Sequence, residues 1–174
     1  MPPWTVHHRR FWLTLIAAAA VAGCGGSDAD EGVRVEGALD RPTTVTASGL
    51  AAQSPVTQTV HYTAAGTPQT RTYTGPTLWN LLSGMGIQTH STPKNDVLNR
   101  YVMATAADGY RGVFALGELH PDYGNKAALL AYDETRDGKT APIGAEDGPF
   151  RITAPGDIKG GRYLSNVTRL DVRS

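Results

Sequence analysis

Cysteine is nearly absent from this chain: Cys24 is the only one among 174 residues. No intrachain disulfide can therefore form, and metal sites built from several thiolates and Cys-x-x-Cys redox motifs are excluded. A domain that follows Cys24 must be stabilised by its own core, since no covalent cross-link is available to it.

An excess of charge of either sign is also missing. Lys and Arg together number 16, and so do Asp and Glu, which gives a formal net charge of +0 at pH 7. A surface that binds nucleic acid normally shows a basic excess or a basic stripe. The composition therefore argues against a nucleic-acid partner.

Most short motifs of catalysis and metal binding are lacking as well. The sequence contains no Gly-x-Ser-x-Gly elbow, phosphate loop or haem-attachment motif. The later histidines, His61, His90 and His120, are far apart and show no ligand spacing. We therefore expect no zinc site, although acidic residues on both sides of His120 could polarise its ring.

The only long apolar run, residues 11–22, follows two arginines near the N-terminus. This layout is typical of a secretory signal, and the run is shorter than the roughly 20 apolar residues that cross a bilayer. Small residues before Cys24 resemble the bacterial lipobox, in which the thiol is alkylated by lipid before cleavage. We expect residues 1–23 to be a signal peptide and Cys24 to anchor the protein in a bacterial cell envelope, facing the periplasm or exterior. The alternative is an ordinary signal peptide with an incidental cysteine.

A flexible tether and one domain are expected after the signal. Residues 24–32 comprise Cys24 and a stretch with no apolar side chain larger than alanine, which cannot pack. Residues 33–174 are long enough to form a single domain with its own core.

Short runs of β-branched and aromatic residues, broken by Gly, Pro, Asp and Asn, dominate this domain and predict strands. Helices are expected after Pro76, at residues 116–119 and around Leu50. The pattern predicts an α+β fold: a mostly β single domain with a few short helices. The expected strands are Val33 to Leu39, Thr43 to Ala47, Val56 to Thr63, Gln69 to Thr74, Arg100 to Ala106, Arg111 to Ala115, Ala127 to Asp133, Phe150 to Ala154 and Val167 to Val172.

Three segments resemble, in order, parts of one known family. Residues 74–82 look like a strand-to-helix step, residues 104–119 like a central hairpin and turn, and residues 148–162 like a closing strand and loop. Together they are similar to the oxidoreductase molybdopterin-binding domain, the sulfite oxidase fold. The resemblance implies a molybdenum atom held by the dithiolene of a pterin, and two-electron oxidation or reduction of small oxo-compounds.

The cysteine that ligates molybdenum in that family has no counterpart here. By the resemblance it would stand at the end of the strand that precedes the Gly66 turn, near His61, Tyr62 or Thr63, where a soft thiolate would remain bound through the redox cycle. His61 could donate an imidazole nitrogen instead, or be a half-buried structural residue. Tyr62 is the next candidate ligand, or a buried tyrosine whose hydroxyl is satisfied.

A glycine-containing basic loop could hold the phosphate of the pterin. Lys159 and Arg162 offer positive charge, and the two glycines between them allow a close backbone approach. The alternative is a solvated turn. Arg151 could point into the same cleft, or pair with an acid such as Asp108 or Glu118.

The turn Asp108-Gly109-Tyr110 also occurs in the family. Asp followed by Gly is a hairpin signal in its own right, which favours a structural role. Tyr110 could line the cleft.

Two functions of different classes follow. The first is a membrane-anchored, molybdopterin-binding oxidoreductase-like domain that transfers oxygen atoms or electrons, with an unidentified redox or protein partner. Its cofactor would be bound by His61, Arg151, Lys159 and Arg162. The second is a non-catalytic binding or accessory module that kept the fold and lost the metal.

Replacing Cys24 tests the anchor. In the Cys24→Ser variant the thioether to lipid cannot form, so we expect loss of labelling by radioactive palmitate and release from the membrane fraction or retention of the uncleaved precursor. Unchanged labelling and membrane association in the variant would refute lipidation at Cys24.

Overall fold

The computed structural model describes Met1 and residues 32–174. The expected signal peptide, the expected lipidation of Cys24 and most of the expected tether fall outside these residues. The expected fold class is confirmed: the described chain is mostly β, forms one domain and carries three short helices.

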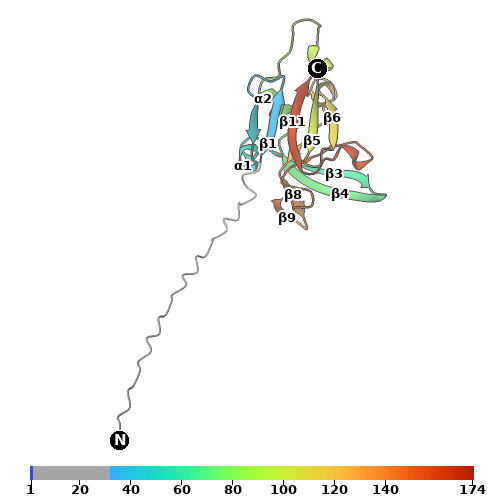
Figure 1. The fold of residues 1–174 in the computed structure, drawn as a ribbon. Helices are drawn as coiled ribbons and strands as arrows, with labels where there is room; N and C mark the ends of the chain where they lie inside the picture. The colour runs from blue at the N-terminus through green and yellow to red at the C-terminus, as the bar shows by residue number, and fades with distance from the viewer. Residues whose placement is uncertain (2–31) are drawn as a thin grey trace.

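A five-stranded sheet brings the first and last strands of the domain together (Figure 1). Its order is β2-β1-β11-β5-β6, and β1 runs parallel to β11, with Val35 beside Leu170. The other neighbours are antiparallel. These strands are β1 (Val33–Gly37), β2 (Thr43–Val45), β5 (Tyr101–Ala106), β6 (Arg111–Ala115) and β11 (Val167–Arg173).

A four-stranded sheet in the order β3-β4-β8-β9 extends from a long hairpin. Ala65 and Gly66, both with positive φ, form the two-residue turn between β3 and β4. Such turns match the twist of the strands they join. The members are β3 (Val56–Ala64), β4 (Thr67–Gly75), β8 (Asp133–Arg136) and β9 (Lys139–Pro142).

Several expected strands are shorter than predicted, and one hairpin was not predicted. The first two end at Gly37 and Val45, and Ala47, expected at the end of the second, begins α1. Only β7 (Leu130–Ala131) and β10 (Arg151–Ile152) are strands within the segments around them, and they pair with each other. The hairpin of β8 and β9 turns at Asp137 and Gly138, which both have positive φ. The polar and charged residues of these two strands show no alternation of apolar and polar side chains. The Asp137-Gly138 pair is nevertheless a hairpin signal in its own right.

Short helices occupy the three expected positions: α1 (Ala47–Ala51), α2 (Leu78–Gly84) and α3 (Leu116–Leu119). Helix α2 begins at Leu78, two residues after Pro76, because the Thr77 hydroxyl accepts a hydrogen bond from the Asn80 amide at 3.1 Å and caps the helix. Two 3₁₀ turns are also present, η2 (Asp96–Asn99) and η3 (Gly160–Arg162).

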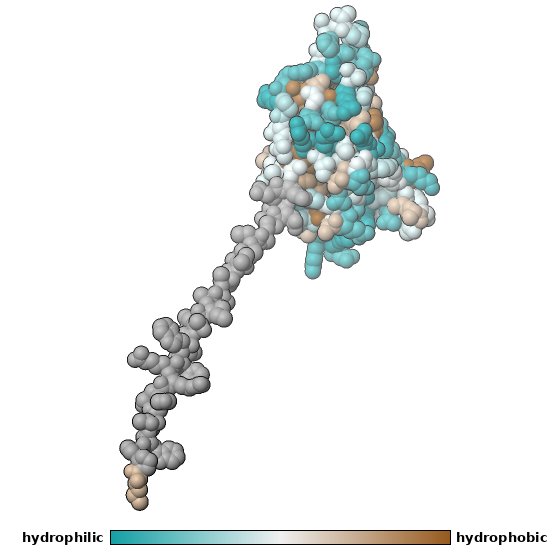
Figure 2. Space-filling model, viewed as in Figure 1, coloured by the Kyte–Doolittle hydropathy of each residue, from teal (hydrophilic) through white to brown (hydrophobic). Residues whose placement is uncertain are grey.

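One continuous core lies between the sheets and helices. Tyr73, Phe114, Phe150 and Leu81 are among its largest buried side chains. On the face shown in Figure 2, hydrophobic side chains form small, separate patches within a largely hydrophilic surface. Within the part of the chain that the structure describes, no helix has both the length and the apolar character needed to span a membrane.

Gly75 is required where β4 passes β7. A Cβ atom there would lie 2.1 Å from the Leu130 carbonyl oxygen, a backbone atom that cannot easily move. We expect Gly75→Ala to lower the free energy of unfolding by about 1–3 kcal/mol, measured by urea denaturation. The control is Gly84→Ala at the end of α2, where a Cβ meets nothing within 4 Å; it should be neutral or stabilising by up to about 1 kcal/mol. Equal effects of the two substitutions would contradict this account.

Candidate functional site

A cleft of about 400 Å³ lies where the closing loop of the domain meets the end of β3. It is lined by residues 62–66, Arg151, Lys159 and the two glycines that follow Lys159. The cleft thus brings together two of the four residues that the sequence suggested for cofactor binding, Arg151 and Lys159.

The loop is held against β3 by backbone contacts. The Thr63 amide donates to the Ile158 carbonyl oxygen at 2.9 Å. Gly160 packs on the Tyr62 ring so closely that a Cβ there would be 3.2 Å from it. On the other side, the Tyr110 hydroxyl donates to the Gly161 carbonyl oxygen at 2.9 Å. Gly160 therefore allows the loop to pack closely on Tyr62, whereas the sequence suggested that the two glycines let the backbone approach a phosphate.

His61 does not line this cleft. Successive side chains of a strand point to opposite faces, and Tyr62 is the residue that points inward. The exposed His61 ring instead lies with its Nδ1 3.0 Å from the Thr70 hydroxyl across the hairpin. The structure therefore separates His61 from Arg151 and Lys159.

Tyr62 fills the inward position at the end of β3. Its side chain is buried, with 6% exposure, and its ring stacks on that of Tyr163 with centroids 3.9 Å apart. Its hydroxyl accepts a hydrogen bond from Arg151 Nη2 at 3.2 Å. One of the two hypotheses from the sequence was a buried tyrosine whose hydroxyl is hydrogen bonded, and the structure has this arrangement at Tyr62.

Arg151 is buried and paired with an acid, as one of the two sequence hypotheses held. The partner is Asp147, four residues before it, and not Asp108 or Glu118. Nη1 also donates to the Ser165 hydroxyl. Arg151 Nε has no partner among the described residues, although it is buried.

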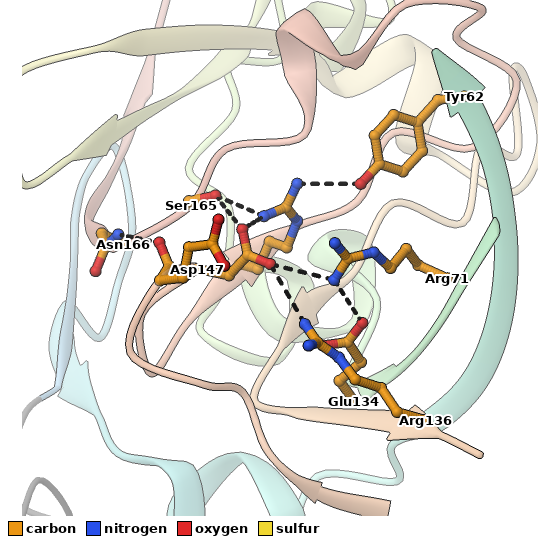
Figure 3. A network of polar contacts seen from close by, with 9 residues as sticks. Tyr62, Arg71, Glu134, Arg136, Asp147, Ser165 and Asn166 are labelled. Carbon is orange, nitrogen blue, oxygen red and sulfur yellow. Dashed lines mark hydrogen bonds and ion pairs between the residues drawn. The ribbon is translucent and has the colours of Figure 1, made fainter. Parts of the chain in front are cut away.

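Asp147 connects Arg151 to a wider network of charges (Figure 3). Arg71 Nη1 lies 2.9 Å from Glu134 Oε1 and 3.5 Å from Asp147 Oδ2. Arg136 Nη2 lies 2.7 Å from Glu134 Oε2. Three guanidinium groups thus face two carboxylates. Sequence reasoning missed this network because Glu134 and Arg136 lie on the hairpin that it did not predict.

Buried tyrosine hydroxyls border the same region. Burial raises the pKa of Tyr163 to about 12, and it raises that of Tyr73 as well. Neither hydroxyl has a hydrogen-bond partner among the described residues. Both phenols are therefore neutral at physiological pH, and Tyr73 lies under the Arg151 guanidinium, 5.7 Å from its ring centroid.

Arg162 is engaged by carboxylates and does not reach the cleft as a free cation. Its Nε and Nη2 each donate to Asp157 at 2.7 Å, and Nη1 donates to Glu118 at 2.8 Å. Lys126 Nζ lies within 3.6 Å of both acids. The hydrogen bond from Arg162 lowers the pKa of Asp157, and that from Asp157 raises the pKa of Arg162. This arrangement, which we call the Arg162 clamp, ties η3 to α3.

The remaining sequence candidates have local structural partners. Asp108 Oδ1 accepts from the Tyr110 amide at 2.8 Å and stabilises the hairpin turn. The His120 ring packs between Trp79 and Tyr123, with centroids 4.2 and 5.0 Å away. Among the described residues, no three His, Cys, Asp or Glu side chains gather as a metal site would require.

The cleft fits an anionic group better than it fits a molybdenum centre. Lys159 forms no ion pair with a carboxylate of the described residues, so its charge remains available. The position expected for the thiolate ligand is filled by Tyr62, whose hydroxyl is bonded to Arg151 and whose ring is stacked. The donor set of the resemblance is therefore incomplete at this site.

Comparison with known proteins supports the fold alone. No family model matches the chain, and no curated protein matches it. Among solved structures, it is similar to the sulfane dehydrogenase SoxCD from Paracoccus pantotrophus, with a TM-score of 0.65 and 18% sequence identity. The match covers 84% of this chain and 39% of that chain, so this chain spans well under half of its structural neighbour. At this identity the similarity shows a shared fold and nothing more.

Proposed function

We propose that this domain is a non-catalytic binding or accessory module that has the fold of an oxidoreductase domain and does not use molybdenum. The observation that carries this proposal is the closed contact of Tyr62 with Tyr163 and Arg151. A metal at the end of β3 would need this ring to leave its stack and Arg151 to lose a hydrogen bond. Both groups are buried, so such a change would be costly.

The ligand that the cleft suits best is one with an anionic group. Lys159 supplies a positive charge to the lining of the cleft, and Arg151 lines it as well. Arg162 contributes little attraction, because Asp157 and Glu118 neutralise it. Lys159 is therefore the residue on which we expect binding to depend most.

The alternative is oxygen-atom or electron transfer at a molybdenum pterin. Its support is the similarity in fold to a protein named as a dehydrogenase, and the same Lys159 would then hold the phosphate of the pterin. Both proposals place the domain at a bacterial membrane through a lipid on Cys24, where it would meet a protein or redox partner.

Metal analysis separates the two functions. The full chain is produced in a host that synthesises the molybdenum cofactor and is purified from membranes, and molybdenum and pterin are measured per chain. We expect far less than one of each, because no cysteine stands at the end of β3 and Tyr62 is held there by Tyr163 and Arg151. Stoichiometric molybdenum and pterin would overturn the binding-module proposal and establish the alternative.

A pair of substitutions tests the assignment of the cleft residues. We expect Lys159→Ala to abolish the chemical-shift changes that inorganic phosphate causes at the Gly160 and Gly161 amides, without altering thermal stability. Arg162→Ala should lower the free energy of unfolding by roughly 2 kcal/mol, since it removes three charge-assisted hydrogen bonds to two partly buried carboxylates. If the wild-type protein shows no response to phosphate, or if Lys159→Ala retains it, the cleft is not an anion site.

A further inference from the structure

Strand β3 forms a long sheet edge that lacks the usual protection against pairing. Natural proteins blunt such edges with short strands, charged side chains, proline, bulges or a covering segment. β3 is nine residues long, contains no charged residue and no proline, and pairs with β4 in continuous register from Val56 to Ala64. Five of its residues are valine or threonine, which favour extended structure.

The other outer strands of the two larger sheets are protected. β2 has three residues. β9 has four and includes Lys139 and Pro142. At β6, Arg162 Nη1 donates to the Val113 carbonyl oxygen at 3.2 Å and occupies part of the edge. β3 therefore stands apart among the sheet edges of the described chain.

The backbone groups of alternate β3 residues face away from the hairpin. In a two-residue hairpin the two residues next to the turn, here Ala64 and Thr67, form a hydrogen-bonded pair. Every second residue of β3 counted back from Ala64 is likewise hydrogen bonded to β4, and the residues between them direct their backbone groups away from β4. The amides of Thr57, Thr59 and His61 thus point outward. The Thr63 amide, in the same phase, does bond outward, to Ile158.

These outward groups have no backbone partner among the described residues. Polar backbone groups without a protein partner must be hydrated. The exposed side chains of Thr57, Thr59 and His61 agree with an edge that is open to water.

The outer face beside this edge is built from paired hydroxyl groups. The side chains of Thr57 and Thr74 are 2.8 Å apart, and those of Thr59 and Thr72 are 2.9 Å apart. The strand register places Thr72 beside Thr135, which pairs with Thr140 through a 2.8 Å hydroxyl contact. One row of four threonines therefore crosses the whole sheet and ends at Thr59.

We propose that β3 binds β3 of a second copy of this chain, antiparallel and about a two-fold axis at Thr59. This register places Thr59 opposite Thr59 and Thr57 opposite His61, so all the outward amides and carbonyls of these residues find partners. The partner is a second copy of the chain because β3 is complementary to itself. The strand contains no Asp, Glu, Lys or Arg that would repel its copy. Thr59 would also face Thr59 of the copy, as it already faces Thr72 within the hairpin. Strand pairing alone buries less than a standard interface, so the dimer is weak and favoured by crowding on a membrane.

The test combines sedimentation velocity with hydrogen exchange on the full chain purified in detergent, over a range of protein concentrations. We expect the sedimentation coefficient to rise with concentration. Exchange at the amides of Thr57, Thr59 and His61 should slow in parallel, while the amides of Gln58 and Val60, bonded within the hairpin, should be slow throughout.

Two matched variants locate the contact. Thr59→Lys places two like charges opposite each other at the axis and should prevent association, whereas Thr72→Lys puts the same charge one strand inward and should retain it. Thr59→Pro removes an outward amide and keeps the backbone hydrogen bonds of the hairpin, although the hydroxyl contact with Thr72 is lost, and it should also give monomers.

Three results would overturn the proposal. They are a monomer at every concentration, association that persists in both Thr59 variants, and protection of the three amides that appears only when cell extract is added to a monomeric chain. The last result would assign the edge to a different protein.

Discussion

The buried guanidinium of Arg151 is the interaction on which the arrangement around the cleft depends. It comes from β10 and joins Tyr62 of β3, Asp147 of the preceding loop and Ser165 of the segment that leads into β11. A charge taken out of water must be paired and hydrogen bonded, or it destabilises the fold. Asp147 and its neighbours meet that requirement, and so fix how the four-stranded sheet sits against the closing loop.

Two arginines that look alike in the sequence therefore do different work. Arg151 is enclosed and orders the residues at the back of the cleft, while Arg162 lies on the other side of the loop and ties it to α3. Only Lys159, between them in the chain, keeps a charge without a carboxylate partner among the described residues. The basic residues of this segment suggest more positive charge than a ligand would meet. Asp147 pairs with Arg151, and Asp157 and Glu118 pair with Arg162. Glu118 is distant in the sequence, and the other two acids lie four and five positions before their partners.

The sequence predicted most of the fold and part of the site, for identifiable reasons. The alternation in Val56 to Thr63 predicted β3, and the apolar run after Pro76 predicted α2. Both are local patterns, and the structure contains both elements. The strands β8 and β9 were missed because charged and polar residues leave no apolar alternation along them, and Glu134 is the only buried residue of the two strands. The pairing of Arg151 with an acid was foreseen, but its partner was not, since loop conformation decides which carboxylate is near. His61 and Lys159 are separated because the His61 side chain points to the face of β3 opposite the cleft. A shift of one residue in the strand would turn it to the other face, so the sequence alone did not decide this point.

The parallel pairing of β1 with β11 has a mechanical consequence. The described chain enters the domain at Gly32, directly before β1, which lies between β2 and β11. A pull on the residues before Gly32 along the axis of β1 would load the hydrogen bonds on both of its sides together, in shear, and could not open them one at a time. The domain would thus resist a force that is applied through the residues before Gly32.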